Sequence, residues 1–199
     1  MKKKYVRVAF VAFLVITVVA WVWRYCALND YYSSRSTRHQ EFFSSGEMVP
    51  FGTDYIAQGM YAEGYSIRVD DFEIVDYNKF ISDSGVNIEQ NALAPERLAL
   101  VSITLRNENS KEEGVMLTEL ELHGIDATVG MNWSLLLAVN PVLQGNYGIS
   151  LRQGSEYSFV LPYNLQEEYF GNDTWRNMEE YHFWLQITGF PTQREIAVQ

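Results

Sequence analysis

The segment Leu98-Ala-Leu-Val-Ser-Ile-Thr-Leu-Arg-Asn107 carries the strongest strand pattern in the chain. Its apolar positions are Leu98, Val101, Ile103 and Leu105, and the polar positions between them are Ser102, Thr104 and Arg106. A period of two is typical of a β-strand that places one face against a core. We therefore predict that this segment is a central strand and that its apolar side chains form part of the core.

Short segments of the same kind lie on both sides of this strand and are separated by turn residues. Strands are expected at 48–51, around 55–56, at 65–75, at 147–151, at 156–163, at 181–188 and at 194–199, with a hairpin over 115–131 that turns at Gly124. Short strands at a spacing of about 8–12 residues indicate an all-β sandwich. The segments 48–51 and 194–199 are expected at sheet edges.

The strand at 65–75 contains a change of parity. Tyr65, Ile67 and Val69 are apolar at odd positions, whereas Phe72 and Ile74 are apolar at even positions. One extra residue in a strand produces such a change, so we predict a β-bulge near Asp70-Asp71. The following residues, 76–84, are predicted to form a short helical turn that Gly85 ends.

Two connections are harder to classify. Residues 132–145 include Trp133-Ser-Leu-Leu-Leu-Ala-Val139, which is apolar on all sides, and we expect a buried loop or helical turn at one end of the sandwich. Residues 166–180 are expected to hold one helical segment with Asp173 as its N-cap.

The N-terminus has the character of a membrane anchor. Sixteen residues without charge separate Arg7 from Arg24, a helical length of about 24 Å against a bilayer core of about 30 Å. Four basic residues precede this run and one follows it, which places the N-terminus in the cytoplasm and the rest of the chain outside. A cleaved signal peptide is the main alternative, and lipidation at Cys26 is a further one. The bulky residues Trp21 to Tyr25 fit both alternatives poorly.

Three parts follow from this pattern. Residues 1–28 form the cytoplasmic tip and transmembrane anchor, residues 29–46 a flexible, Ser-rich stem, and residues 47–199 one extracytoplasmic β-sandwich domain. About 150 residues are enough for one core without disulfides.

The charge distribution excludes one class of partner. Residues 1–26 hold five of the 15 Lys and Arg residues and none of the 25 Asp and Glu residues. The remainder has 10 basic against 25 acidic residues, a net charge of −15. Such a domain repels nucleic acid and anionic membrane surfaces, so we expect no nucleic-acid partner.

No catalytic motif is apparent. The three histidines, His39, His123 and His182, are spread over separate segments, and one cysteine is present, so no zinc site is expected. No G-x-S-x-G elbow occurs. The acidic cluster of Asp70, Asp71, Glu73, Asp76 and Asp83 lacks the spacing of a calcium loop. We predict a protein that is not an enzyme and has no metal or cofactor, although a pair of carboxylates for glycoside hydrolysis remains open.

Aromatic residues make up 15% of the chain and gather near 163–184. Trp175, Tyr181 and Trp184 are the candidate contact residues, because aromatic side chains are frequent at interfaces. The alternative is that these side chains pack the long connection against the core.

Three groups of motifs resemble a known family. They are Glu63-Gly-Tyr-Ser-Ile-Arg-Val69 with Glu73-Ile-Val-Asp-Tyr77, then Asn140-Pro-Val-Leu-Gln-Gly145, and then Leu151-Arg-Gln-Gly154 with Leu161-Pro-Tyr163. The chain resembles a small family of uncharacterised membrane-anchored proteins of Gram-positive bacteria. The resemblance covers most of residues 47–199 and implies an extracytoplasmic immunoglobulin-like (telokin-like) sandwich, with no assigned activity or site.

The sequence thus favours a membrane-anchored binding module whose partner is another membrane protein, a peptide or a wall polymer. Two alternatives stay open. One is an envelope hydrolase with an unrecognised carboxylate site, and the other is a structural subunit of a membrane complex.

Overall fold

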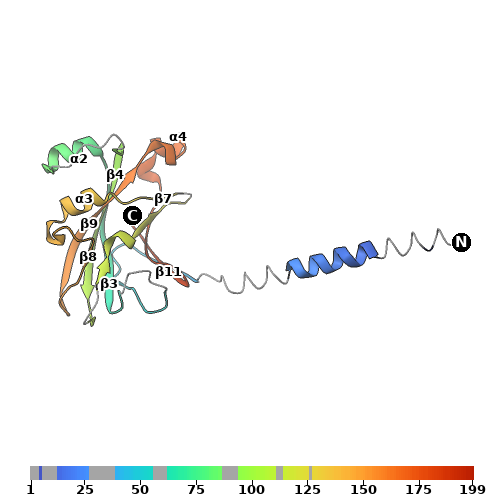
Figure 1. Ribbon diagram of the computed structural model, residues 1–199. Helices are drawn as coiled ribbons and strands as arrows, with labels where there is room; N and C mark the ends of the chain where they lie inside the picture. The colour runs from blue at the N-terminus through green and yellow to red at the C-terminus, as the bar shows by residue number, and fades with distance from the viewer. Residues whose placement is uncertain are drawn as a thin grey trace. The chain divides into compact units, whose positions relative to one another are not determined.

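The computed structural model describes residues 5, 13–26, 39–55, 62–86, 94–110, 114–125 and 127–199. The chain divides into two compact units, Met1–Arg38 and His39–Gln199 (Figure 1). In the first unit, residues 13–26 are helical and Cys26 is exposed. Within the described ranges, no helix combines the length and the apolar character that crossing a membrane requires. Residues 8–12 of the predicted anchor and residues 29–38 of the predicted stem lie outside the described residues.

The second unit is built mainly of β-sheet. One sheet has the order β1 (His39–Phe43), β11 (Thr192–Ala197), β10 (Trp184–Thr188), β6 (Glu121–His123) and β7 (Thr128–Val129). The other has the order β2 (Val49–Pro50), β3 (Tyr65–Asp76), β4 (Arg97–Asn107) and β9 (Glu156–Leu165). A small third sheet pairs β5 (Val115–Met116) with β8 (Gly148–Ile149). The expected all-β sandwich is confirmed.

Helices are short and few in the described part of the chain. The α-helices of the second unit are α2 (Tyr77–Ser84), α3 (Trp133–Val139) and α4 (Asn172–Arg176), and the 3-10 turns are η1 (Leu117–Glu119), η2 (Pro141–Leu143), η3 (Glu167–Tyr169) and η4 (Met178–Glu180). α2 has eight residues and α3 has seven, so each forms about two turns rather than the single turn that the sequence predicted.

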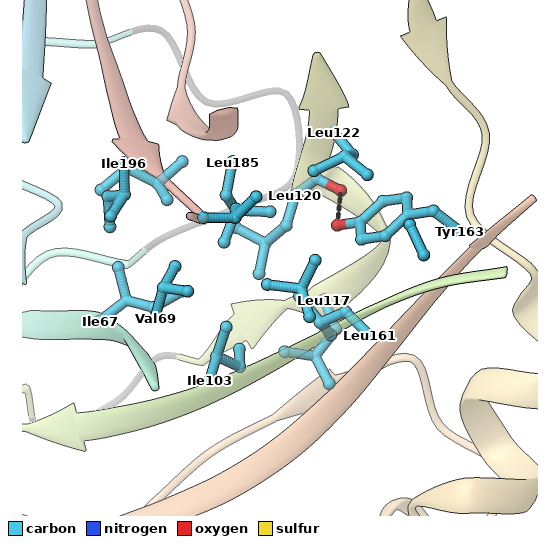
Figure 2. Packing of buried hydrophobic residues seen from close by; sticks show 14 of the residues in the cluster. Ile67, Val69, Ile103, Leu117, Leu120, Leu122, Leu161, Tyr163, Leu185 and Ile196 are labelled. Carbon is cyan, nitrogen blue, oxygen red and sulfur yellow. Dashed lines mark hydrogen bonds between the residues drawn. The ribbon is translucent and has the colours of Figure 1, made fainter. Parts of the chain in front are cut away.

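The core lies between the two large sheets (Figure 2). Ile67 and Val69 of β3 face Leu185 of β10 and Ile196 of β11. Each of these side chains is fully buried, and burying one stabilises the fold by about 1.5–3 kcal/mol. Tyr163 is also buried, and its hydroxyl donates to the carbonyl of Leu120 at 2.8 Å. Burial raises the pKa of Tyr163 well above 10.0, so this hydroxyl stays a donor.

β4 occupies the predicted central position, since β3 and β9 flank it. Its face toward the other sheet includes Val101 and Ile103. Its opposite face carries Leu98 and Leu100, which pack with Tyr77 of α2 and Leu135 of α3. Because both faces are covered at this end, the residues from Leu98 to Val101 are all apolar.

The bulge and the helix after it are confirmed. The pairing of β3 with β4 shifts register between Val69 and Asp71. The Asp76 side chain caps α2 by accepting from the N–H of Lys79 at 2.8 Å, and Gly85 ends the helix with a left-handed φ of 65°. A residue with a β-carbon is disfavoured in that conformation, so glycine suits this position.

The expected hairpin over 115–131 is confirmed only in part. β6 and β7 pair antiparallel around Gly124, but Val115 and Met116 pair with β8 instead. A β-carbon on Gly124 would lie 2.3 Å from the Tyr181 ring, so a larger residue here would have to displace that ring. The 3-10 turn η1 separates β5 from β6, which allows the chain to change sheets.

Two expectations about the ends of the domain are wrong. The stem was expected to run to Gly46, but His39–Phe43 forms β1 and pairs parallel with β11. As a result, the C-terminal strand β11 lies between β1 and β10 rather than at an edge. The pattern around 39–43 lacks alternation, and its strand conformation depends on hydrogen bonds to a segment 153 positions away in sequence.

The apolar segment 132–139 folds as a helix. The Asn132 side chain caps it by accepting from the N–H of Leu135 at 3.0 Å. The predicted N-cap Asp173 is wrong, because α4 begins at Asn172 and Gly171 occupies the cap position. The N–H of Trp175 donates to the Gly171 carbonyl at 2.9 Å, so a backbone bond closes the first turn there.

Candidate binding site at the open edge of β3

β3 is long and its outer neighbour is short. β2 has two residues, which pair with Ser66 and Ile67 of β3. On either side of this pair, the Phe51 N–H donates to Tyr65 at 3.1 Å, and the Gly46 N–H donates to Val69 at 2.9 Å. Past Val69, no described residue hydrogen-bonds to the backbone on this side of β3. Among the described residues, the second half of β3, residues 71–76, therefore has no neighbouring strand on this side, and we call it the open edge.

The direction of the backbone groups on this edge follows from one hydrogen bond. The Tyr77 N–H donates to the Glu96 carbonyl at 3.1 Å, toward β4. Successive residues of a strand direct their N–H and C=O groups to opposite edges. Counting back from Tyr77, Asp76, Ile74 and Phe72 direct theirs away from β4. Of these, Asp76 is the last residue of β3, whereas Phe72 and Ile74 lie inside the strand. These two residues offer four backbone groups to a further strand.

Three hollows flank the open edge. The first has a volume of about 610 Å³, lies against α2, and is lined by Glu73, Ile74, Val75, Asp76, Lys79, Phe80, Asp83 and Ser84. The second, of about 300 Å³, is lined by Ile74, Val75, Asp76, Arg97 and residues 176–180. The third, of about 390 Å³, is lined by Phe72, Glu73, Ile74, Glu179 and Gln199. Ile74 lines all three hollows, so they surround the backbone groups that the edge leaves open.

The floor of the site is apolar. Phe72 and Ile74 pack against the main core, and the Phe72 ring lies 5.8 Å from the ring of Phe183. Val75 packs against the second cluster together with Phe80 of α2. All four side chains remain partly exposed, so both faces of the open edge offer apolar contact to a bound segment.

The rim of the site is charged and mainly acidic. Its acidic side chains are those of Asp71, Glu73, Asp76, Asp83, Glu179 and Glu180, and all of them are exposed. A general acid usually needs burial to hold a proton at neutral pH. Exposed carboxylates are better suited to attracting a cationic group.

Arg97 holds a defined position on the rim. Its guanidinium lies 4.5 Å from the centre of the Trp175 ring, and its Nη1 donates to the Trp175 carbonyl at 3.2 Å. Such a cation–π contact fixes a long side chain that would otherwise be mobile. Trp175 thereby positions Arg97, which lines the second hollow.

The structure separates the three aromatic residues that the sequence nominated. Trp175 is buried, with 7% of its surface exposed, and stacks on Phe170 at 6.2 Å. Tyr181 is half-buried and packs edge-on against Phe183 at 4.9 Å. Trp184 is half-buried on β10, where it lies opposite His123. The prediction that all three form an exposed patch is therefore wrong for Trp175, because its side chain packs in the core.

The acidic cluster of the sequence is also divided. Asp70 pairs with Arg68 at 2.5 Å and accepts from Thr104 at 2.6 Å, on the bulge. Asp76 caps α2. Among the residues described, no group of three or more His, Cys, Asp or Glu side chains is placed to hold a metal ion.

The sequence did not predict Phe72, Ile74 and Glu179 as site residues. The change of parity at Asp70-Asp71 was the one local signal, because bulges are frequent where a strand becomes free of its neighbour. Because β2 runs antiparallel to β3, the open edge results from the late start of β2 at Val49. That start could not be read from the sequence, although the proline that follows it is typical of an edge strand.

The chain belongs to the family described as "Domain of unknown function (DUF5028)", which matches residues 40–194. No curated protein matches it. Among solved structures, the chain is similar to the crystal structure of the yjhA protein from Bacillus subtilis, with a TM-score of 0.42 and 10% sequence identity. That similarity covers 79% of this chain and 99% of the other.

Proposed function

We propose that this protein is a membrane-anchored binding module that captures an extended polypeptide segment by adding it as a strand to the open edge of β3. The observation that carries the proposal is the set of outward backbone groups on Phe72 and Ile74, with hollows on both faces of the strand. Binding by strand addition takes its affinity from main-chain hydrogen bonds and its specificity from pockets for alternate side chains.

The open edge of β3 is less protected against unwanted strand pairing than most sheet edges. Proteins usually cover long edges or place charges on them, because an open edge invites aggregation. Here, Asp71, Glu73 and Asp76 carry charge, but the apolar Phe72, Ile74 and Val75 between them remain partly exposed. This combination supports an edge whose charges repel a second copy of the chain, while its exposed apolar side chains can still contact a bound polypeptide segment.

Anchoring in a membrane is the second part of the proposal. Every described side chain from 13 to 26 is exposed, including Phe13, Ile16 and Trp21. A helix that is apolar on all sides requires an apolar environment to cover it. The basic residues before the run and the acidic domain after it favour an extracytoplasmic position for residues 39–199. An immunoglobulin-like sandwich displayed outside a Gram-positive cell fits this arrangement.

The two alternatives from the sequence have less support. A hydrolase would need an acidic side chain shielded from water, and the carboxylates around the hollows are exposed. A structural subunit would need a large complementary surface, whereas the candidate site is a local edge. Strand addition therefore accounts for more of the observed geometry.

The direct test uses the full chain in lipid nanodiscs and a display library of random 10-residue peptides. We expect enriched peptides with alternating apolar residues. Peptides that bind are then resynthesised with N-methyl groups at every second position, in both registers. Strand addition predicts that one register abolishes binding and the other retains it, because only alternate N–H groups face β3. Equal sensitivity of both registers, or the absence of any enriched peptide, would contradict the proposal.

The location is tested by protease treatment of intact cells. An extracytoplasmic domain is cleaved from the surface, with loss of the full-length band on a blot against residues 39–199. Protection of the full chain in intact cells, with cleavage after lysis, would contradict the proposed topology.

A further inference from the structure

We infer that the segment bound at β3 carries a lysine or arginine side chain, which enters the hollow between β3 and η4. This inference rests on the proposed function and specifies the chemistry of the ligand. The hollow has a volume of about 390 Å³ and is lined by Phe72, Glu73, Ile74, Glu179 and Gln199. The residues of its lining include two apolar and two acidic ones, and none of the five is basic.

The position of the hollow matches one face of an added strand. Phe72 pairs with Val101 and Ile74 pairs with Ala99, both of which point into the core. A residue that an incoming strand places on the same face would lie beside Phe72 and Ile74, at a cross-strand spacing of about 5 Å. The hollow is therefore the subsite for that side chain.

The shape and charge of the lining fit a long cationic side chain. Lys and Arg bury an aliphatic stem along apolar surface while their charged end stays near water. Here Phe72 and Ile74 would contact the stem, and Glu179 would contact the charged end. The side chain of Glu73 points to the opposite face of β3 and adds negative charge at the edge. An acidic side chain would meet the like charge of Glu179, and an apolar side chain would offer Glu179 no ion pair.

The same charges argue against a second copy of this chain as the occupant. Pairing two β3 edges would bring Asp71, Glu73 and Asp76 of one copy close to the same residues of the other. Like charges facing each other across strands are destabilising. The net charge of −15 beyond residue 26 adds long-range repulsion between copies and attraction for a basic segment.

The test uses the full chain in nanodiscs of neutral lipid and four synthetic peptides of the form acetyl-Thr-Val-Thr-Xaa-Thr-Val-Thr-amide. Xaa is Lys, Arg, norleucine or Glu, and binding is measured by isothermal titration calorimetry. We expect the Lys and Arg peptides to bind at least about fivefold more tightly than the norleucine peptide, with a loss of this preference at high salt. The Glu peptide should bind most weakly.

Protein variants locate the effect. Glu179→Gln should reduce the preference for Lys over norleucine, and Glu179→Lys should shift it toward the Glu peptide. Glu119→Gln, an exposed acid on η1, is the matched control and should change neither. If Lys and norleucine peptides bind equally, the cationic subsite is wrong while strand addition stands. If none of the four peptides binds and the library yields no ligand, the proposed function fails together with this inference.

Discussion

Arg194 and Asp54 form a two-point ion pair, with Nη1–Oδ1 at 2.8 Å and Nη2–Oδ2 at 3.1 Å. The same guanidinium donates to the Phe51 carbonyl at 2.7 Å and contacts Glu41 at 2.8 Å through Nε. Arg194 lies on β11, Glu41 on β1, and Phe51 and Asp54 in the segment after β2. One largely buried side chain therefore joins the first strand, the last strand and the connection that leads to β3.

This ion pair predicts a change of stability in acid. Hydrogen bonds from Arg194 and then from Thr192 lower the pKa of Asp54 from 3.8 to about 2. Because the pKa of Asp54 is lower in the folded than in the unfolded protein, its ionised carboxylate stabilises the fold above pH 4. This stabilisation is lost as the pH falls toward 2. The Asp54 side chain is half-exposed, so we expect only about 1 kcal/mol after solvent screening.

The measurement is urea unfolding of the full chain in detergent micelles at pH 6 and pH 2.5, for the wild type and for Asp54→Asn. We expect Asp54→Asn to be less stable than the wild type at pH 6 and closer to it at pH 2.5. An equal difference between the two proteins at both pH values would show that the ionised carboxylate contributes nothing.

The cap of α2 gives a second prediction. Asp76→Ala removes the acceptor for the Lys79 N–H and should cost about 1 kcal/mol of unfolding free energy. Asp83→Ala, in the last turn of the same helix, is the matched control. A carboxylate at a helix C-terminus is slightly unfavourable, so this change should be neutral or stabilising. Equal losses for both variants in urea unfolding would rule out a capping role for Asp76.

The nominated tryptophans give a third prediction. Trp175→Ala empties a buried site behind Arg97 and should cost about 3–5 kcal/mol. Trp184→Ala removes a half-buried side chain from the surface of β10 and should cost about 1 kcal/mol. Both values come from denaturant unfolding. A loss of several kcal/mol for Trp184→Ala would place that side chain in the core and end its candidacy as a contact residue.

Asn140 gives a fourth prediction, at the opposite edge of the same sheet. Its side chain donates to the carbonyls of Leu136 and Val160 at 2.8 and 2.7 Å, and accepts from the Val160 N–H at 2.9 Å. It thus occupies part of the edge of β9 as a strand would. Asn140→Ala leaves these groups without partners and should cost about 2–3 kcal/mol. The exposed Asn146→Ala should change stability little, and similar losses for both would contradict this role.

The sequence predicted the features of the fold that depend on local pattern. These features are the alternation in β4, the bulge at Asp70-Asp71 and the ends of α2 at Asp76 and Gly85. Each follows from residues that are close to it in sequence. The strand β1 could not be predicted in this way. Its five residues form a strand because β11 and the Arg194–Glu41 contact hold them, and both partners are distant in sequence.

The candidate site escaped prediction for a related reason. An open edge is defined by the extent of its neighbouring strand. Because β2 runs antiparallel to β3, residues 71–76 lie beyond the start of β2, so the edge depends on how the chain passes from Phe43 of β1 through Gly46 to Val49. The aromatic content pointed instead to Trp175, which is buried and contacts Arg97 of the site through its ring. Composition can indicate that aromatic residues matter, but burial decides whether they contact a partner or the core.

The most direct test of strand addition is amide hydrogen exchange at residues 71–76. In the free protein, we expect the amides of Phe72 and Ile74 to exchange faster than those of Glu73 and Val75, which face β4. Saturation with a bound peptide should slow Phe72 and Ile74 by at least about tenfold, since each amide then donates to the added strand. Unchanged exchange at both positions, under saturation by a peptide that binds, would contradict the account.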